Sequence, residues 1–398
     1  MNAEPPPITL RRRRAQPFFF RHPWVFSGAV QDVPVGLADG SLVVVTTRSG
    51  DWIGRGFYNS RSQIRVRLFS WDPDETIDEA FWRRRLTAAI DLRRRVLGLT
   101  DPCGACRLVY SDSDGFPGLV VDQYGSHLVI DWGSLALYQR RSMILGLLRE
   151  ALEPTGILSR CDRDVSQKEG IPPGAEWVHG SPAPRPLTVR MGEVRMLVDL
   201  EGGQKTGLYL DQRENYAALA RRFVGMRVLD AFCYVGGFGL AAAAAGAAEV
   251  IGFDTSEPAV RLANEAARLN GLTNARFAAG DVFGELLRVR AAGEMFDAVI
   301  LDPPRFAASR AALPRAARGY KDINLVAMQV LKPGGLLVTC SCSQHVSPNQ
   351  FLDILNKAAK DVARTVQVIE RRGQAADHPV LAACPESGYL KCFICVIR

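Results

Sequence analysis

The feature that most constrains the fold is a regular alternation of short apolar runs and helix-forming segments from about residue 191 onward. The apolar runs predict strands at residues 227–231, 249–253, 275–278, 297–301 and 335–340. Good helix formers lie between most of them, including the alanine-rich residues 240–248 and residues 257–270. This rhythm is typical of an α/β fold with a doubly wound, mostly parallel sheet. In such sheets, ligands bind beyond the carboxyl ends of the strands.

The chain of 398 residues is too long for one ordinary hydrophobic core, so several domains are expected. Residues 1–73 carry short alternating apolar runs separated by Gly, Asn and Ser turns, which predicts a small β-barrel or sandwich. Residues 74–190 predict a small α+β domain, because a helical stretch at 78–97 precedes paired strand patterns. Residues 191–398 form the domain with the parallel sheet.

Composition excludes several protein classes. The hydrophobic content of 47% and the charged content of 23% are ordinary for a soluble globular protein. No run of about 18 apolar residues exists, so we expect no membrane span, and no hydrophobic signal core follows the amino-terminal arginines. Nine cysteines without scaffold spacing indicate reduced thiols and a cytoplasmic location. Cys103 and Cys106 have CxxC spacing, as do Cys392 and Cys395, and no metal site is predicted.

The formal net charge is +7, and the positive charge is unevenly distributed. The basic run at residues 11–14 is followed by an aromatic stretch at residues 18–24. Basic residues interleaved with aromatic ones suit a nucleic-acid backbone with nearby bases. Arginines at 83–85 and 93–95 are better explained by a solvated helix face. The predicted RNA contacts in the first stretch are Arg12, Arg13, Arg21, His22 and Trp24.

Residues 228–239 predict a strand, a glycine turn and a helix start. Glycines let the backbone approach a ligand without a Cβ in the way. The dinucleotide fingerprint GxGxxG does not fit, and no phosphate-loop Lys-Ser/Thr is present. Acidic residues recur at successive strand ends, where Asp254 suits a ribose, Asp281 with Val282 suits an adenine, and Asp230 suits an ammonium group. Each alone would be an ordinary cap or turn residue, but their recurrence favours a nucleoside ligand.

With these features, the chain resembles the class I S-adenosylmethionine-dependent methyltransferases. The resemblance covers about 200 residues and implies a Rossmann-like methyltransferase domain with a mostly parallel seven-stranded sheet. It also implies S-adenosylmethionine as cofactor, a nucleoside without a pyrophosphate. The cofactor contacts that it implies are Asp230, Phe232, Tyr234, Gly236, Asp254, Asp281, Val282 and Asp302, with Tyr209 and Gln212 from the preceding segment.

Asp302-Pro303-Pro304 follows the fourth predicted strand. The prolines stiffen a turn that presents Asp302 and backbone carbonyls to a planar substrate. In the family, Asn/Asp-Pro-Pro marks enzymes that methylate nucleobases or other planar nitrogen groups. Arg305, which follows the prolines, is a further candidate RNA contact.

Two thiols, Cys340 and Cys342, lie at the end of the next predicted strand. Cytosine C5 is a poor nucleophile until a thiolate attacks C6, and a carboxyl group at N3 stabilises the charge that develops. In RNA cytosine-5 methyltransferases the catalytic Cys follows the second Gly of a Gly-Gly turn by seven residues. Counting from Gly335 gives Cys342 as nucleophile, with Asp302 as its partner. Cys340 falls inside the strand, where a free Cys is usually packed in the core.

The whole chain resembles the RlmI-type 23S ribosomal RNA cytosine-5 methyltransferases. Residues 21–28 resemble the start of their PUA domain, an RNA-binding barrel, and residues 113–122 resemble the hairpin of their central domain. Residues 203–213, 318–324 and 374–379 also match. Many RNA cytosine-5 enzymes carry a second Cys after the strand-four proline, whereas this chain has Arg305 after Pro304. How the C5 proton is removed and the nucleophile released is therefore left open.

These observations predict a methyltransferase that forms 5-methylcytosine in 23S ribosomal RNA by attack of Cys342 on C6. The substrate is free ribosomal RNA or the assembling large subunit, and a homodimer is left open. Two alternatives remain. One is a methyltransferase acting on guanine N7 or N2, which needs no thiol. The other is a non-catalytic ribosome-assembly factor that binds RNA and retains the cofactor site.

Overall fold

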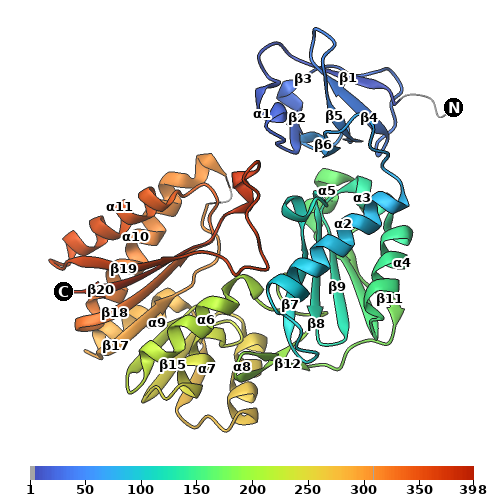
Figure 1. Ribbon diagram of the computed structural model, residues 1–398. Helices are drawn as coiled ribbons and strands as arrows, with labels where there is room; N and C mark the ends of the chain where they lie inside the picture. The colour runs from blue at the N-terminus through green and yellow to red at the C-terminus, as the bar shows by residue number, and fades with distance from the viewer. Residues whose placement is uncertain (1–4, 308) are drawn as a thin grey trace. The chain divides into compact units, whose positions relative to one another are not determined.

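The computed structural model describes residues 5–307 and 309–398, and the chain divides into two compact units (Figure 1). The first unit comprises the chain up to Ala183 together with Asp377–Ser387. The second unit comprises Pro184–Ala376 together with Gly388–Arg398. The chain therefore leaves the second unit near its end, joins the first for one short segment, and returns. The division into three domains at residues 73 and 190 stays a prediction.

The first unit begins with a six-stranded sheet in the order β2-β6-β5-β4-β1-β3. β1 pairs in parallel with β4, and the other pairs are antiparallel. Ile8, Val43, Val45 and Val66 are fully buried in its core, as expected for β-branched residues on the inner face of a curved sheet. The elements are β1 (Pro7–Leu10), α1 (Gln16–Phe19), β2 (Trp24–Phe26), β3 (Val30–Asp32), β4 (Leu42–Thr46), β5 (Trp52–Tyr58) and β6 (Ile64–Ser70).

A five-stranded sheet in the order β11-β10-β9-β8-β7 completes this unit with its helices. Phe57 of β5 and Phe69 of β6 pack on Trp82 of α2, so one apolar core joins the two sheets. Asp78 caps α2 by accepting a hydrogen bond from the Phe81 N–H at 2.9 Å. The elements are α2 (Glu79–Asp91, continued by a π-helical turn at Leu92–Val96), β7 (Ala105–Tyr110), β8 (Leu119–Tyr124), β9 (His127–Trp132), α3 (Leu135–Gln139), α4 (Arg141–Leu152), β10 (Gly156–Cys161), α5 (Arg163–Glu169) and β11 (Gly174–Gly180).

The returning segment Asp377–Ser387 is held in the first unit by buried polar contacts. The Arg93 guanidinium donates to the Asp377 carbonyl at 2.7 Å, and the Arg107 N–H donates to the Asp377 carboxylate at 2.9 Å. At the other end, the Tyr110 hydroxyl donates to the Ser387 carbonyl at 2.7 Å. The sequence pattern around residues 374–379 predicts only a loop. This loop contains Asp377, whose contacts hold the returning segment in the first unit.

The second unit is built on a seven-stranded sheet in the order β16-β15-β14-β17-β18-β20-β19. The first five strands pair in parallel, and β20 runs antiparallel to both β18 and β19. This confirms the predicted doubly wound, mostly parallel sheet. The strands are β14 (Arg227–Ala231), β15 (Glu249–Asp254), β16 (Ala275–Ala279), β17 (Phe296–Leu301), β18 (Leu331–Ser341), β19 (Val366–Arg372) and β20 (Lys391–Ile397), preceded by the hairpin β12 (Leu187–Met191) and β13 (Val194–Val198).

Helices cover both faces of this sheet. α9, α10 and α11 bury apolar side chains against one face, and α6 and α7 cover the other. In Figure 1, α10 and α11 run side by side along the sheet. The helices are α6 (Arg213–Ala220), α7 (Gly237–Ala244), α8 (Glu257–Leu269), α9 (Val282–Ala291), α10 (Leu313–Gln329) and α11 (Pro348–Asp361). Among the described residues, no helix has the length and apolar character needed to span a membrane.

Candidate active site

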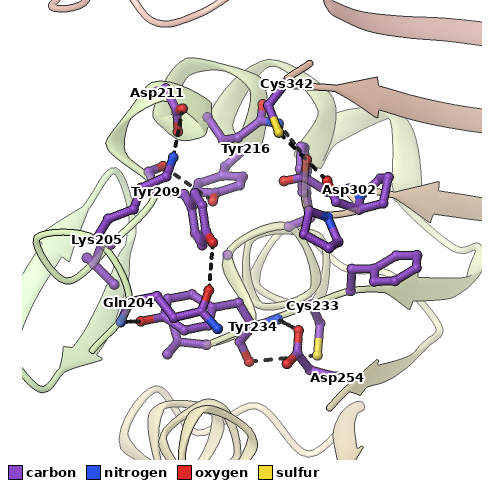
Figure 2. Close-up of a pocket in the computed structure, with 18 of the residues that line it drawn as sticks. Gln204, Lys205, Tyr209, Asp211, Tyr216, Cys233, Tyr234, Asp254, Asp302 and Cys342 are labelled. Carbon is purple, nitrogen blue, oxygen red and sulfur yellow. Dashed lines mark hydrogen bonds and ion pairs between the residues drawn. The ribbon is translucent and has the colours of Figure 1, made fainter. Parts of the chain in front are cut away.

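A cavity of roughly 280 Å³ opens in the second unit beyond the carboxyl ends of β14, β15, β17 and β18 (Figure 2). This is where ligands bind in doubly wound sheets. Its lining includes residues from the segment 204–212, the glycine turn at 232–237, Asp254, residues 302–305 and Cys342. Cys342 and Asp302, the predicted catalytic pair, therefore face one cavity.

The glycine turn is held in an unusual backbone conformation. Phe232 and Tyr234 have φ angles of 66° and 50°, in the left-handed region that costs non-glycine residues about 1 kcal/mol or more. Gly237 begins α7, and a Cβ there would lie 2.4 Å from the Tyr216 ring, so only glycine fits. Two strand-end acids brace the turn: Asp230 accepts the Gly239 N–H at 2.8 Å and Asp254 accepts the Tyr234 N–H at 2.9 Å.

Spare hydrogen-bonding capacity around the turn fits a nucleoside cofactor that carries an ammonium group. Asp230 is buried, and its Oδ1 has no hydrogen-bond partner among the described residues. Burial raises the pKa of Asp230 to about 7, opposed by the Gly239 N–H. Asp254 lines the cavity and receives backbone N–H groups from Tyr234 and Ser256, one on each oxygen, which leaves lone pairs for a ribose.

The predicted cofactor residues divide into three groups in the structure. Lining the cavity are Phe232, Tyr234, Asp254, Asp302, Tyr209 and Gln212. Asp230 and Gly236 belong to the strand end and turn, outside the lining. Asp281 and Val282 are also outside it: Asp281 caps α9 by accepting the Gly284 N–H at 2.8 Å, and Val282 is buried in the apolar core. A cofactor contact at these last two residues stays a prediction.

Cys342 and Asp302 lie at the ends of neighbouring parallel strands, because Leu301 of β17 pairs with Thr339 of β18. The Cys342 Sγ lies 4.0 Å from the Pro303 carbonyl oxygen, and Asp302 accepts a 3.1 Å hydrogen bond from the Gln212 amide. Burial raises the pKa of Asp302 to about 7, and the Asp211 carboxylate adds to this effect. Burial and the Asp302 carboxylate raise the pKa of the Cys342 thiol, and Lys205 opposes them.

Cys340 occupies a different environment from Cys342. It lies within β18, is fully buried, and pairs with Cys392 of β20 across the antiparallel ladder. Burial raises the pKa of its thiol well above the ordinary value. The prediction that Cys340 is packed inside the strand is confirmed. Cys233, which had no predicted role, lines the cavity from the glycine turn.

Three charged residues near the cavity were missed by the sequence analysis. Lys205 and Asp211 lie in the segment 203–213, and their ammonium and carboxylate groups are 3.4 Å apart. Lys391, at the start of β20, is buried and donates to the carbonyl groups of Ser343 at 2.6 Å and Tyr389 at 2.7 Å. Lys205 and Asp211 could have been found from the sequence, because they are charged residues within the segment 203–213 that resembles the related methyltransferases. Nothing in the local sequence singles out Lys391, because its position depends on strand pairing.

The predicted RNA contacts of the amino-terminal stretch lie in the first unit. Arg12, Arg13 and Arg21 are exposed. Trp24 is partly buried, and its indole N–H donates to the Asp112 carboxylate at 2.6 Å. Phe19, Phe20 and Phe26 are exposed aromatic side chains of the same stretch. Another candidate, Arg305, lines the cavity of the second unit.

His22 belongs to a small polar cluster with Cys384 and Glu386, whose potential metal-ligand atoms lie within 4.8 Å of one another. The Trp24 N–H donates to the His22 Nδ1 at 3.2 Å, so neutral His22 carries its proton on Nε2. That nitrogen lies 3.3 Å from the Glu386 carboxylate. Hydrogen bonds within the protein therefore explain the cluster, and the predicted lack of a metal stays a prediction.

Comparisons with known proteins agree with this architecture. Residues 154–392 match the family model of S-adenosylmethionine-dependent methyltransferases, and residues 8–71 match a PUA-like domain. The chain is 42% identical to the ribosomal RNA large subunit methyltransferase I of Erwinia tasmaniensis, with 98% of each chain covered. It is 41% identical to the protein of that name from Photobacterium profundum, with 98% of this chain and 99% of that protein covered.

The fold also matches a methyltransferase crystallised with SAH, at a TM-score of 0.85 and 21% identity over 98% of this chain and 100% of that one. At that identity the likeness concerns the fold alone. The family match and the two relatives decide the classification, and they support S-adenosylmethionine as the cofactor. The chain belongs to the S-adenosylmethionine-dependent methyltransferase family, in the group of ribosomal RNA large subunit methyltransferase I proteins.

Proposed function

We propose that the protein methylates C5 of a cytosine in 23S ribosomal RNA and that Cys342 forms a covalent bond to C6 during the reaction. The main support is the placement of a thiol and a carboxyl group at the ends of two neighbouring strands, facing one cavity. An enzyme that methylates a ring nitrogen needs no such thiol. The names of the relatives support large-subunit ribosomal RNA as the substrate.

Both units contribute residues that bind the RNA substrate. The exposed arginines Arg12, Arg13 and Arg21 neutralise phosphates, and the PUA-like domain supplies the surrounding surface. The target cytosine leaves its stack and enters the cavity, as bases do in enzymes that act on them. Arg305, at the cavity wall beside Pro304, binds a phosphate of the flipped nucleotide.

Within the cavity, Asp302 and Cys342 divide the chemistry. Asp302, with its pKa raised to about 7, donates a proton to cytosine N3. The Cys342 thiolate attacks C6, and a C–S bond forms while electron density moves to C5. Bound S-adenosylmethionine supplies the methyl group that C5 takes up. A base then takes the C5 proton, and the C–S bond breaks with its electron pair returning to the Cys342 sulfur. N3 returns its proton to Asp302, which restores the aromatic ring and both catalytic groups.

The product of the reaction tests this proposal. Unmodified 23S ribosomal RNA is incubated with the protein and S-adenosylmethionine, both free and in assembling subunits, and its nucleosides are identified by mass spectrometry. The expected product is 5-methylcytidine, absent with Cys342→Ala although that variant binds the cofactor. Methylation of guanine at N7 or N2, or 5-methylcytidine from Cys342→Ala, would contradict the proposal. No turnover with either RNA would favour a non-catalytic assembly factor.

Two wider expectations stay predictions. A cytoplasmic location agrees with a ribosomal substrate, and fractionation of cells would check it. Assembly as a homodimer would be detected by sedimentation of the full chain.

A further inference from the structure

We propose that Lys205 is a positioning residue that holds Cys342 as a thiolate for attack on the base. The inference rests on the proposed function, in which Cys342 is the nucleophile. Lys205 lines the same cavity as Cys342 and Asp302, and Figure 2 shows all three around it. A thiolate is the reactive form of cysteine, and a nearby cation stabilises it.

The backbone around Lys205 is fixed in a strained form. Lys205 has a φ angle of 50°, in the left-handed region that non-glycine residues rarely adopt. Hydrogen bonds hold its neighbour Gln204 on both sides: the Gln204 N–H donates to the Tyr234 hydroxyl at 3.0 Å, and the Tyr209 hydroxyl donates to the Gln204 side chain at 2.7 Å. Strain of this kind persists only where surrounding contacts impose it, often at functional sites.

The ammonium group of Lys205 is also held in place. It lies 3.4 Å from the Asp211 carboxylate and 4.2 Å from the centre of the Tyr209 ring. Asp211 is fixed in turn by the Tyr389 hydroxyl, which donates to it. The ammonium group is therefore kept at the cavity wall, on a side chain that is 45% exposed.

Charges on the surrounding elements show why a cation is needed at this position. Asp302 and Asp211 both disfavour a negative charge on Cys342, and burial adds to their effect. Lys391 lies behind the strand end, but its ammonium is committed to two backbone carbonyls, and burial lowers its pKa to about 8. Tyr209, in the cavity lining, and Tyr320, buried beside Ser343, stay neutral because burial raises their pKa. Lys205 and Arg305 are the basic side chains that line the cavity, and Lys205 is the one whose charge favours the Cys342 thiolate.

The effect of Lys205 grows when the site is filled. In the open cavity water screens the attraction between its ammonium and the thiolate. A bound base and cofactor displace this water, and the same two charges then interact in a medium of lower dielectric constant. Lys205 would therefore favour the thiolate most strongly once the substrate is in place.

Alkylation of Cys342 in the absence of RNA tests the inference directly. The full-length protein is treated with iodoacetamide between pH 6 and 10, and the rate at Cys342 is read by mass spectrometry of its peptide. Lys205→Met should slow this rate at pH 7.5 about three- to tenfold, and shift the profile to higher pH, because the thiol pKa rises by roughly half to one unit. Lys205→Arg should restore most of the rate.

Lys332→Met is the matched control, because Lys332 is 49% exposed and paired with Asp297 at 2.7 Å, at the opposite end of β18. It should leave the alkylation profile unchanged. Superimposable profiles for Lys205→Met and the unmodified protein would overturn the inference, as would an equal shift in Lys332→Met. A weaker RNA affinity of Lys205→Met with unchanged alkylation would also overturn it, since Lys205 would then be a phosphate contact. The proposed function fails separately, if Cys342→Ala still forms 5-methylcytidine.

Discussion

The Cys342 thiol lies 4.0 Å from the carbonyl oxygen of Pro303, the residue that follows Asp302. This contact joins the ends of β17 and β18, two central strands of the sheet. Because paired strands fix both ends, the thiol and the carboxyl group are positioned before any substrate arrives. Preorganisation of this kind reduces the motion that the reaction itself requires.

The pH dependence of methylation should reflect the protonation of the Asp302 carboxyl group. In the proposed mechanism the protonated carboxyl group is the active form, so with its pKa at about 7 the active fraction falls above that pH. The Cys342 thiolate fraction rises with pH over the same range, because its pKa is raised. The rate should therefore rise up to about pH 7 and then level off. Asp302→Asn should be roughly a hundredfold slower at pH 7 and should keep rising with pH, because it has lost the titrating acid. An unchanged profile in this variant would exclude the role of Asp302 as acid.

Asp230 should make the second unit less stable at alkaline pH. Its folded pKa of about 7 lies above the ordinary 3.8, so its contribution to stability is present below pH 4 and is lost as pH rises through 7. Asp230→Asn keeps an oxygen for the Gly239 N–H and removes the buried charge. It should unfold less readily than the unmodified protein by roughly 2–4 kcal/mol at pH 8, with the difference shrinking toward pH 4.

Tryptophan fluorescence would report only on the first unit, because all six tryptophans lie there. Hydrogen exchange of peptides from β14 is therefore the appropriate measurement for this prediction. A stability difference that does not vary with pH would contradict it. The same variant should bind S-adenosylmethionine more weakly, because a neutral amide attracts an ammonium group less than a carboxylate does.

Much of the second unit could be predicted from the sequence, because parallel strands buried on both faces are strong apolar runs. The predicted strand at 249–253 ends one residue short of the observed β15, and that at 335–340 begins four residues after β18. The strand-end residues Asp254, Asp302 and Cys342 reach one cavity because sheet topology gathers strand ends. Contacts that depend on the pairing of distant segments could not be predicted, such as Lys391 with Ser343 and Tyr389 with Asp211.

Cys340 should contribute to stability and not to chemistry. It packs in the core beside Val338, Cys392 and Ile394. Cys340→Ala should reduce the free energy of unfolding by about 1–2 kcal/mol, since it removes a small buried group, and should retain methylation within a few-fold. Loss of activity in Cys340→Ala that is as complete as in Cys342→Ala would reverse the assignment of the two thiols.

The amino-terminal arginines should determine affinity for RNA. Replacing Arg12 and Arg13 together with alanine removes two exposed charges without disturbing a buried contact. The RNA dissociation constant should increase, and the slope of log affinity against log salt should decrease by about 0.7–0.9 for each phosphate that is no longer neutralised. Turnover at saturating RNA should be unchanged. Filter binding at several salt concentrations measures the slope, and a slope equal to that of the unmodified protein would exclude both arginines as phosphate ligands.

Trapping on RNA that contains 5-fluorocytosine tests covalent attack by Cys342 most directly. Fluorine at C5 cannot leave as a proton does, so after methylation the C6–S bond persists and the protein stays attached to the RNA. With S-adenosylmethionine present, we predict a denaturation-resistant complex of the unmodified protein, with the RNA on the Cys342 peptide, and no complex for Cys342→Ala. A complex that forms through another cysteine, or methylation of unmodified RNA without any complex on the fluorinated RNA, would contradict the proposed mechanism.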